Sequence, residues 1–370
     1  MPKKSIVSYA FYNNKGGVGK TTLCQNAACL YAESHPKTLV LVVDCCPQAN
    51  ISQFLLGGGH VGFQKNQQIQ QHATRKNVVG FVDHLLRGNQ NFTSLKTEFR
   101  TQVSKHNHYT ADNLYLIAGD GFLESLSLAL NYAVINPANT QAWKEYMTAF
   151  RRLCEHELEM SDYAQAVVFY DCNPSFSIYT QMALLSADRL IIPMMADFTS
   201  VEGIKGVFSL LYGKYPSAAF ERYASNIVTF TKQVGSFSLD LPTVFELVFN
   251  NYTIKAGIAT AFSSIRDELV QFCWEQYGKF PHLFMPIQSD DDEDDDAPPA
   301  SNMEEWKSIY LSDIKDFHTA GKVSASLGIP LHRLPERQNY TMPDGDHVAL
   351  SKDQYSVSLG EIQKFVDKII

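Results

Sequence analysis

A glycine-rich run near the N-terminus carries residue types that bind phosphate. It reads Lys15-Gly16-Gly17-Val18-Gly19-Lys20-Thr21-Thr22, after the apolar run Ile6–Phe11 and before a stretch suited to a helix, Thr21–Ser34. A strand, a glycine-rich turn and a helix N-terminus in this order form a cradle of backbone N–H groups for phosphate. We expect Lys20 to reach the β- and γ-phosphates and the Thr21 hydroxyl to bind Mg²⁺. The run therefore predicts a nucleotide site.

The run departs from the usual P-loop at its first position. The pattern G-x-x-x-x-G-K-[ST] has glycine where this chain has Asn14, and a second lysine, Lys15, follows. In this respect the run resembles the deviant Walker A motif of the ParA/MinD family of ATPases, closest to ParA-like partition ATPases. The resemblance implies ATP and Mg²⁺ as cofactors. It also implies a catalytic role for Lys15, which in that family reaches the nucleotide of the other subunit across a homodimer interface.

An aspartate ends a second apolar run. Asp171 follows Ala166–Tyr170, and beside a P-loop this pattern is typical of a Walker B strand whose aspartate holds Mg²⁺ directly or through water. The continuation Cys172-Asn173-Pro174-Ser175 resembles the switch II turn of the family. We expect Asp171 to be catalytic and to bind the metal, with Thr21; an ordinary strand-end turn is the alternative.

The segment 44–50 resembles the family's switch I, Asp-x-Asp-Pro-Gln-x-Asn, with one difference. The matching positions are Asp44, Pro47, Gln48 and Asn50. Cys46 stands where the family has its second aspartate, which orients the water that attacks the γ-phosphate. A thiol does this poorly, because it is a weak hydrogen-bonding group and is mostly protonated near neutral pH. We expect Asp44 to be catalytic and hydrolysis to be slow or partner-dependent; the alternative is a protein that binds ATP and dimerises but barely turns over.

A strand ending in an amide pair is the candidate for base binding. Asn250 and Asn251 follow the apolar run Phe245–Phe249. Relatives commonly place a residue of this strand end on the adenine, so the resemblance indicates Asn250, although Asn is also a good turn former. We expect a last strand at Leu327–Leu331 and a segment bordering the adenine at Pro335–Tyr340.

Apolar runs of strand length alternate with helical patterns along the chain. Strands are expected at Ile6–Phe11, Thr38–Val43, Asn113–Ile117, Ala166–Tyr170, Arg189–Met194, Ile227–Thr231 and Phe245–Phe249. Helices are expected at Thr21–Ser34, Val79–Leu86, Phe122–Tyr132, Thr140–Glu157, Tyr179–Ser186, Ser200–Tyr212 and Thr260–Tyr277. This alternation predicts an α/β fold, a mostly parallel twisted sheet with helices on both faces, with its site at the carboxyl ends of the strands.

Composition sets the class of protein. The 370 residues are 45% hydrophobic with a formal net charge of −8, and the chain has no apolar stretch of about 18 residues and no room for a signal peptide before its first strand. We therefore expect a soluble cytoplasmic protein whose seven cysteines are reduced thiols. We expect one ATPase domain over residues 1–370, with a variable insertion at about 60–113 and an acidic surface loop at about 287–302 that holds Asp290–Asp296.

The resemblance also implies a cycle and partners. Family members dimerise around ATP, separate after hydrolysis, and use this cycle with a cargo- or centromere-binding adaptor protein to partition or position DNA or other cargo. Three functions stay open: a partition ATPase that binds non-specific DNA, a membrane-associated positioning ATPase, and a nucleotide-locked assembly factor with little turnover.

Two features bear on the surface to which such a dimer would bind. The basic residues that could bind DNA are scattered, and we favour ordinary solvated charges for each: Lys205, Lys214, Arg222, Lys232, Lys255 and Arg266. The C-terminal segment Glu361–Ile370 has apolar residues at helical spacing. Because acidic residues accompany its lysines, we expect it to pack on the core rather than to bind a membrane.

Overall fold

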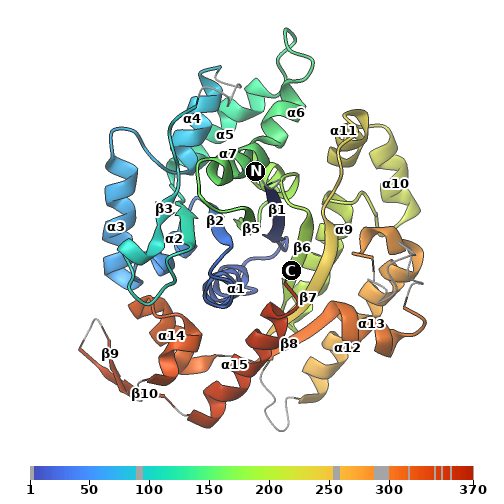
Figure 1. Ribbon diagram of the computed structural model, residues 1–370. Coiled ribbons are helices and arrows are strands. Elements are labelled where there is room, and N and C mark those ends of the chain that lie inside the picture. Colours follow the sequence, from blue (N-terminus) through green and yellow to red (C-terminus); the bar gives the residue numbers. More distant parts are fainter. Residues whose placement is uncertain are drawn as a thin grey trace.

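The structure, a computed structural model, describes residues 4–88, 95–252, 259–286, 300–315, 317–336, 339–342, 345–350 and 352–369. An eight-stranded sheet lies at its centre (Figure 1). The strand order is β3 (Thr101–Gln102), β4 (Leu114–Ile117), β2 (Leu39–Cys45), β5 (Gln165–Cys172), β1 (Ser5–Phe11), β6 (Arg189–Met194), β7 (Thr243–Tyr252) and β8 (Leu311–Lys315). Only the β3–β4 pairing in this sheet is antiparallel, and the other pairs are parallel. The predicted α/β fold is confirmed.

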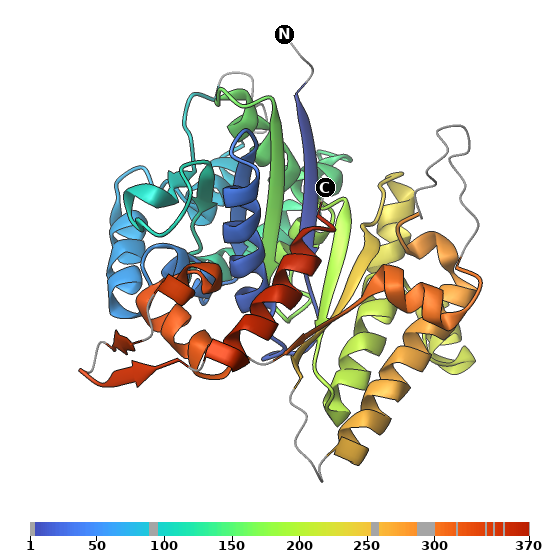
Figure 2. The same cartoon turned by 60° about the horizontal axis from the view of Figure 1, so that its bottom comes forward.

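Helices cover both faces of the sheet. Those whose apolar residues join the first core are α4 (Val78–Leu86), α5 (Phe122–Ala133), α6 (Ala142–Met147), α7 (Ala149–Glu159), α8 (Ile178–Leu184), α9 (Phe198–Leu210), α11 (Phe230–Ser236), α12 (Ala259–Lys279) and α13 (Met303–Tyr310). The second core takes residues from α1 (Lys20–Ser34), α2 (Asn50–Leu55), α3 (Gly59–Gln71), α14 (His318–Leu327) and α15 (Lys352–Val366). Figure 2 shows α1 and α15 on the same side of the sheet. The remaining elements are α10 (Ala218–Ser225), the 3₁₀ turns Val103–Lys105, Pro281–Leu283 and Leu331–Glu336, and the hairpin β9 (Asn339–Thr341) and β10 (His347–Ala349).

The central strand β1 has apolar residues that face both sides of the sheet. Tyr9 and Phe11 pack in the second core, whereas Ala10 and Tyr12 pack in the first. A strand that is covered on both faces has no polar side, so its sequence shows no alternation. The chain then leaves the sheet at the carboxyl end of β1 and enters the glycine-rich run.

Two of the segments that were predicted as strands are not strands, so these predictions are wrong. Ile227–Thr231 lies outside the sheet: Ile227 and Val228 are exposed, and Thr229 accepts a hydrogen bond from the backbone N–H of Lys232 as the N-cap of α11. Leu327–Leu331 is also not a strand, because Gly328 (φ 64°) ends α14 in the left-handed conformation and a 3₁₀ turn begins at Leu331.

Other elements differ in extent from the prediction. The helix expected at Thr140–Glu157 is divided into α6 and α7 around Thr148. Residues 60–113, predicted as an insertion, contain most of α3, all of α4 and the short strand β3. Strand β8 was not predicted. The acidic run Asp290–Asp296 lies outside the described residues.

The C-terminal helix packs on the core, as predicted. Its apolar residues Ile362, Phe365 and Val366 are buried in the second core, and Ile369 after it is buried too. Within the described ranges no helix is both long enough and apolar enough to cross a membrane.

Candidate nucleotide-binding site

The glycine-rich run forms an open loop between β1 and α1. Gly17 (φ 76°) and Gly19 (φ 84°) adopt the left-handed conformation that glycine tolerates. A Cβ atom on Gly19 would lie 1.7 Å from Nδ2 of Asn250, so a larger residue there would have to displace that side chain. Gly19 precedes α1 directly and no side chain caps that helix, which leaves the first N–H groups of α1 able to bind an anion.

Lys20 is folded into this loop. Its side chain is buried, and Nζ donates hydrogen bonds to the carbonyl oxygens of Lys15 (2.8 Å) and Asn13 (3.3 Å). Burial lowers the pKa of Lys20, and the nearby charge of Asp171 opposes that shift. The two carbonyl oxygens are weak, neutral acceptors for the Lys20 ammonium. A phosphate group in the loop would be a stronger, charged acceptor for it.

Thr21 and Asp171 meet where a metal ion would be held. Thr21 Oγ1 donates to Asp171 Oδ2 at 2.9 Å, because Phe11 at the end of β1 is in register with Asp171 at the end of β5. The second oxygen of Asp171, Oδ1, is buried and has no hydrogen-bond partner among the described residues. An orphaned carboxylate oxygen beside a hydroxyl fits Mg²⁺, which prefers a few oxygen ligands and keeps the rest for phosphate and water.

Asp44 lies directly beside Asp171, as its register partner on the adjacent strand β2. It accepts hydrogen bonds from the Cys46 N–H (3.1 Å), the Ser52 N–H (3.2 Å) and the Ser52 hydroxyl (2.6 Å). Burial raises the pKa of both carboxyl groups, and the charge of Asp44 raises that of Asp171 further. The charge of Lys20 opposes this rise at Asp171, and a bound divalent cation would oppose it further.

Ser52 was not among the predicted site residues. Its hydroxyl also accepts the N–H of Gly119 at 2.8 Å, so it joins Asp44 to the segment after β4. The three donors on Asp44 fix the turn of switch I around this carboxylate. A catalytic role for Asp44 stays a prediction.

Cys46 is half-buried at the rim of the site. Its sulfur accepts a weak hydrogen bond from Nδ2 of Asn173 in switch II, at 3.6 Å. Burial, together with the charge of Asp44, raises the pKa of Cys46 to about 12. The thiol is therefore protonated at neutral pH and has no charge with which to orient a water molecule.

Lys15 is held by its own subunit. Its ammonium forms an ion pair with Asp197 and lies 3.1 Å from the Ser200 hydroxyl, while its backbone N–H donates to the side chain of Asn13 at 3.0 Å. Burial acts to raise the pKa of Asp197, but the hydrogen bonds from Lys15 and Thr199 outweigh it, so the net pKa is lowered.

Asp197 and Ser200 were also not predicted. Asp197 is the N-cap of α9 and accepts the Ser200 N–H at 3.0 Å. An aspartate and a serine at N-cap spacing directly after β6 are a local signal that could have located this helix start, although not its contact with Lys15.

Asn250 contacts the P-loop. It lies buried at the carboxyl end of β7, and its Nδ2 donates to the carbonyl of Val18 at 3.2 Å. Its Oδ1 is buried without a hydrogen-bond partner in the described part of the chain, which leaves one acceptor for a ligand. The side chains of Asn251 and of residues 335–338, predicted near the adenine, lie outside the described residues. Of the rest of the predicted segment Pro335–Tyr340, Asn339 begins β9 and Tyr340 is buried in the second core.

The structure thus gathers most of the predicted site at neighbouring strand ends. The residues brought together are Lys15, Gly16, Gly17, Val18, Gly19, Lys20, Thr21, Thr22, Asp44, Asp171 and Asn250. Over the ranges that the structure describes, no cluster of three or more His, Cys, Asp or Glu side chains could hold a metal ion. A metal bound here would therefore depend on Asp171, Thr21 and the phosphates of a nucleotide.

Comparison with known proteins gives one family and two distant relatives. A model of the family described as AAA domain matches residues 6–212, more than half of the chain. An uncharacterized protein of Pseudomonas putida is 25% identical over 197 residues, which cover 53% of this chain and 59% of that protein. A Pseudomonas putida protein described as an uncharacterized protein in gidB 3'region matches equally. The chain spans about three fifths of the length of these curated relatives.

Solved structures share the fold. The structure of pnob8 ParA superposes with a TM-score of 0.55 at 14% identity, covering 98% of this chain and 97% of that chain. Apo McdA of Cyanothece gives 0.53 at 13% identity, covering 97% and 98%. An ATP complex of a McdA variant from Cyanothece gives 0.52 at 13% identity, covering 98% and 95%. At these identities the likeness shows the common fold.

Proposed function

This chain belongs to the AAA domain family, and from that premise we propose that it is a ParA-type switch ATPase. It binds ATP with Mg²⁺, forms a homodimer around the nucleotide, and hydrolyses ATP slowly or with a partner's help. The contact that carries the proposal is the 2.9 Å hydrogen bond from Thr21 to Asp171, beside the unpartnered Asp171 oxygen at the mouth of the P-loop. This contact supports the proposal because a hydroxyl and a carboxylate oxygen side by side are ligands that Mg²⁺ prefers.

Each residue of the loop has a separate task in this proposal. The N–H groups of the loop and of the first turn of α1 bind the phosphates, and Lys20 exchanges its carbonyl partners for phosphate oxygens. Thr21 and Asp171 hold Mg²⁺, which neutralises charge on the phosphates. Lys15 leaves Asp197 and reaches the nucleotide of the second subunit, so ATP stabilises the dimer.

The thiol of Cys46 supports slow turnover. Because its pKa is raised to about 12, it supplies no negative charge where the family has an aspartate. Losing a group that orients the attacking water removes about 10²–10⁴ in rate. The same observation favours a second candidate, a nucleotide-locked assembly factor that stays dimeric in ATP.

For the cargo, and for the surface to which the dimer binds, we propose a class rather than a particular molecule. Partition or positioning of DNA or another cargo through an adaptor protein is the family use that we propose here. Of the candidate basic residues, Lys205 is paired with Glu202, Arg266 with Asp313, and Lys232 with backbone carbonyls, so these three have partners within the chain. Lys255 lies outside the described residues. The burial of the apolar face of α15 argues against the membrane alternative.

The experiment that tests the proposal compares ATP turnover with ATP-dependent dimerisation in wild type and Lys20→Ala. Wild type is expected to dimerise on adding ATP and Mg²⁺, by size-exclusion chromatography with light scattering, and Lys20→Ala is expected to stay monomeric. A wild-type protein that binds no ATP, or that is equally dimeric without it, overturns the proposal. Retention of the ATP dimer on non-specific DNA, with a steep loss in salt, would select the DNA-partition form.

A further inference from the structure

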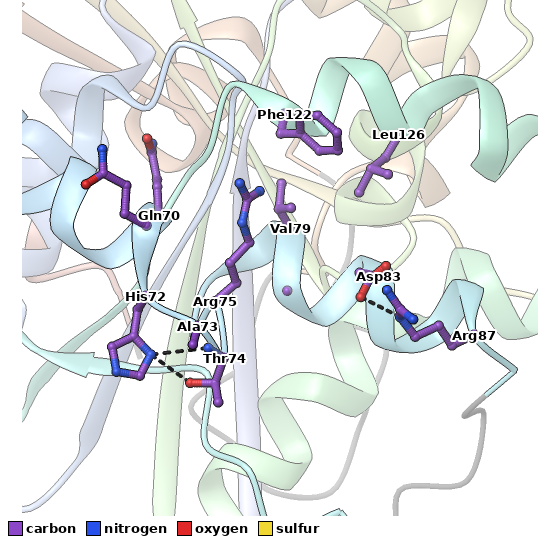
Figure 3. A pocket seen from close by; sticks show the side chains of 12 residues that line it. Gln70, His72, Ala73, Thr74, Arg75, Val79, Asp83, Arg87, Phe122 and Leu126 are labelled. Atoms are coloured by element: carbon purple, nitrogen blue, oxygen red, sulfur yellow. Dashed lines mark hydrogen bonds and ion pairs between the residues drawn. The ribbon is translucent and has the colours of Figure 1, made fainter.

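A second cavity lies on the side of the molecule formed by α3, α4 and α5. It has a volume of about 490 Å³ and lies between the end of α3, the first turns of α4 and the start of α5 (Figure 3). None of its lining residues belongs to the proposed nucleotide site. It is therefore separate from that site.

Arg75 enters this cavity from a strained turn. Its φ of 34° is in the left-handed region, which is strained for a bulky residue. The turn is tight: the Arg75 carbonyl accepts the Asn77 N–H at 2.9 Å, and a Cβ on Gly80 would lie 1.7 Å from that oxygen. Glycine or asparagine would serve such a turn better. The backbone gives no reason for arginine here, so the reason lies in the guanidinium.

The guanidinium is only partly used by the protein. One of its nitrogens lies 3.3 Å from Asp120, and its plane lies over the ring of Phe122, 5.3 Å from the centroid. Asp120 has two closer donors, the Asn77 amide and the Phe122 N–H, each at 2.9 Å. In the described part of the chain Asp120 is the only polar partner of Arg75, whose side chain is 41% exposed. The remaining donors of its planar fork are available to a ligand.

The rest of the lining joins polar side chains (Gln70, Gln71, His72 and Thr74) to an apolar wall, and it has one charged end. Phe122 is 52% exposed, and with Val79 and Leu126 it forms an apolar wall next to the guanidinium (Figure 3). At the other end Asp83 and Arg87 are paired at 2.7 Å. A ligand that fits has an apolar body for the wall and a planar acceptor for the fork of Arg75.

We propose that this cavity binds an apolar carboxylate, with its two oxygens on Arg75 and its apolar body against Phe122, Leu126 and Val79. A carboxylate matches a guanidinium with two parallel hydrogen bonds. A phosphate dianion suits the site less well, because Asp83 and Asp120 add negative charge at both ends. The carboxylate comes either from the C-terminal apolar residue of a protein partner or from a free aryl or alkyl acid.

The test uses two pairs of probes on the full chain. The first pair is 4-phenylbutyrate and its amide; the second is the peptide acetyl-Gly-Ser-Gly-Phe with a free and with an amidated C-terminus. Binding is measured by saturation-transfer NMR titration, and a dissociation constant on the order of 1 mM is expected for an acid of this size. The acids are expected to bind at least about tenfold more tightly than their amides.

Substitutions of Arg75 test whether its guanidinium causes the preference for the acid over the amide. Arg75→Gln is expected to remove the difference between acid and amide, and Arg75→Lys to keep only part of it. Arg222→Gln, which changes an exposed arginine on α10, is the matched control and is expected to bind like wild type. Thermal melts of all variants show whether they are folded.

Each outcome decides the proposal. Tighter binding by the free peptide than by 4-phenylbutyrate identifies a protein C-terminus as the source, and the reverse order identifies a free acid. If acid and amide bind alike, if neither acid binds, or if folded Arg75→Gln binds as wild type does, the proposal is overturned.

Discussion

The ammonium of Lys15 is ion-paired with Asp197 of the same subunit, although the proposed function requires that ammonium at the nucleotide of the other subunit. Both groups are partly exposed, at 19% and 37% of their side-chain surface, so the pair is a weak restraint of about 0.2–1 kcal/mol. Dimerisation must exchange this carboxylate for phosphate. Asp197 therefore competes with the second subunit for Lys15.

Asp197→Asn is expected to strengthen the ATP-dependent dimer by about two- to fivefold, because it removes the competing charge. Asparagine caps helices as well as aspartate does, so α9 should keep its start. The dimer dissociation constant in ATP and Mg²⁺ is measured by analytical ultracentrifugation. The double variant with Lys15→Ala is the control and should lose the gain; an unchanged constant in Asp197→Asn alone contradicts the prediction.

Cys46→Asp is expected to raise ATP turnover by about 10- to 100-fold. The substitution restores a carboxylate where the raised thiol pKa leaves a neutral group, and the gain should stay below the full range of general acid–base effects. Turnover is measured as phosphate release at saturating ATP. Cys46→Asn, similar in size but uncharged, should give a much smaller gain. A wild-type rate in Cys46→Asp would mean that another group positions the water.

Gly19→Ala is expected to weaken nucleotide binding by more than about tenfold. Alanine is strained at a φ of 84°, and its Cβ would overlap the Asn250 amide. Affinity is measured by fluorescence titration with a labelled ATP, with Gly235→Ala, where a Cβ meets nothing within 4 Å, as the control. A wild-type affinity in Gly19→Ala would contradict the prediction.

The sequence predicts the parts of the site whose residues are close together in the chain. The P-loop run and the aspartate ending β5 are local patterns, and the structure joins them through Thr21 and Asp171. The contacts of Lys15 with Asp197 and of Asp44 with Ser52 depend instead on how the chain folds around them. No local pattern of residue types specifies such contacts.

The errors in the fold have a similar origin. β8 pairs only with β7 at the sheet edge and buries only Ile314, so its sequence lacks the continuous apolar run of an interior strand. Ile227 and Val228 have strand-forming side chains, but no neighbouring strand covers them and Thr229 begins a helix instead. The strand propensity of Ile227 and Val228 predicted the wrong element, because contacts with the rest of the fold determine the structure at these positions.

Glu157→Gln is expected to flatten the pH dependence of stability. Burial raises the pKa of Glu157 to about 7, despite its hydrogen bond from the Phe99 N–H at 2.6 Å and the charge of Arg100. Because this pKa is above that of the unfolded chain, the folded state binds more protons, and the stabilising effect is lost as pH rises from about 4.5 to 7. The loss in wild type is on the order of 1–3 kcal/mol.

The free energy of unfolding of wild type and Glu157→Gln is measured by urea titration between about pH 5 and 8. Wild type should lose stability with rising pH, and Glu157→Gln should lose less. Some slope should remain in the variant, because burial also raises the pKa of Glu246, to about 6. Glu155→Gln, on the exposed side of α7, is the control and should keep the wild-type slope. Parallel curves for wild type and Glu157→Gln would mean that Glu157 is ionised in the folded protein, with Arg100 as its counter-ion.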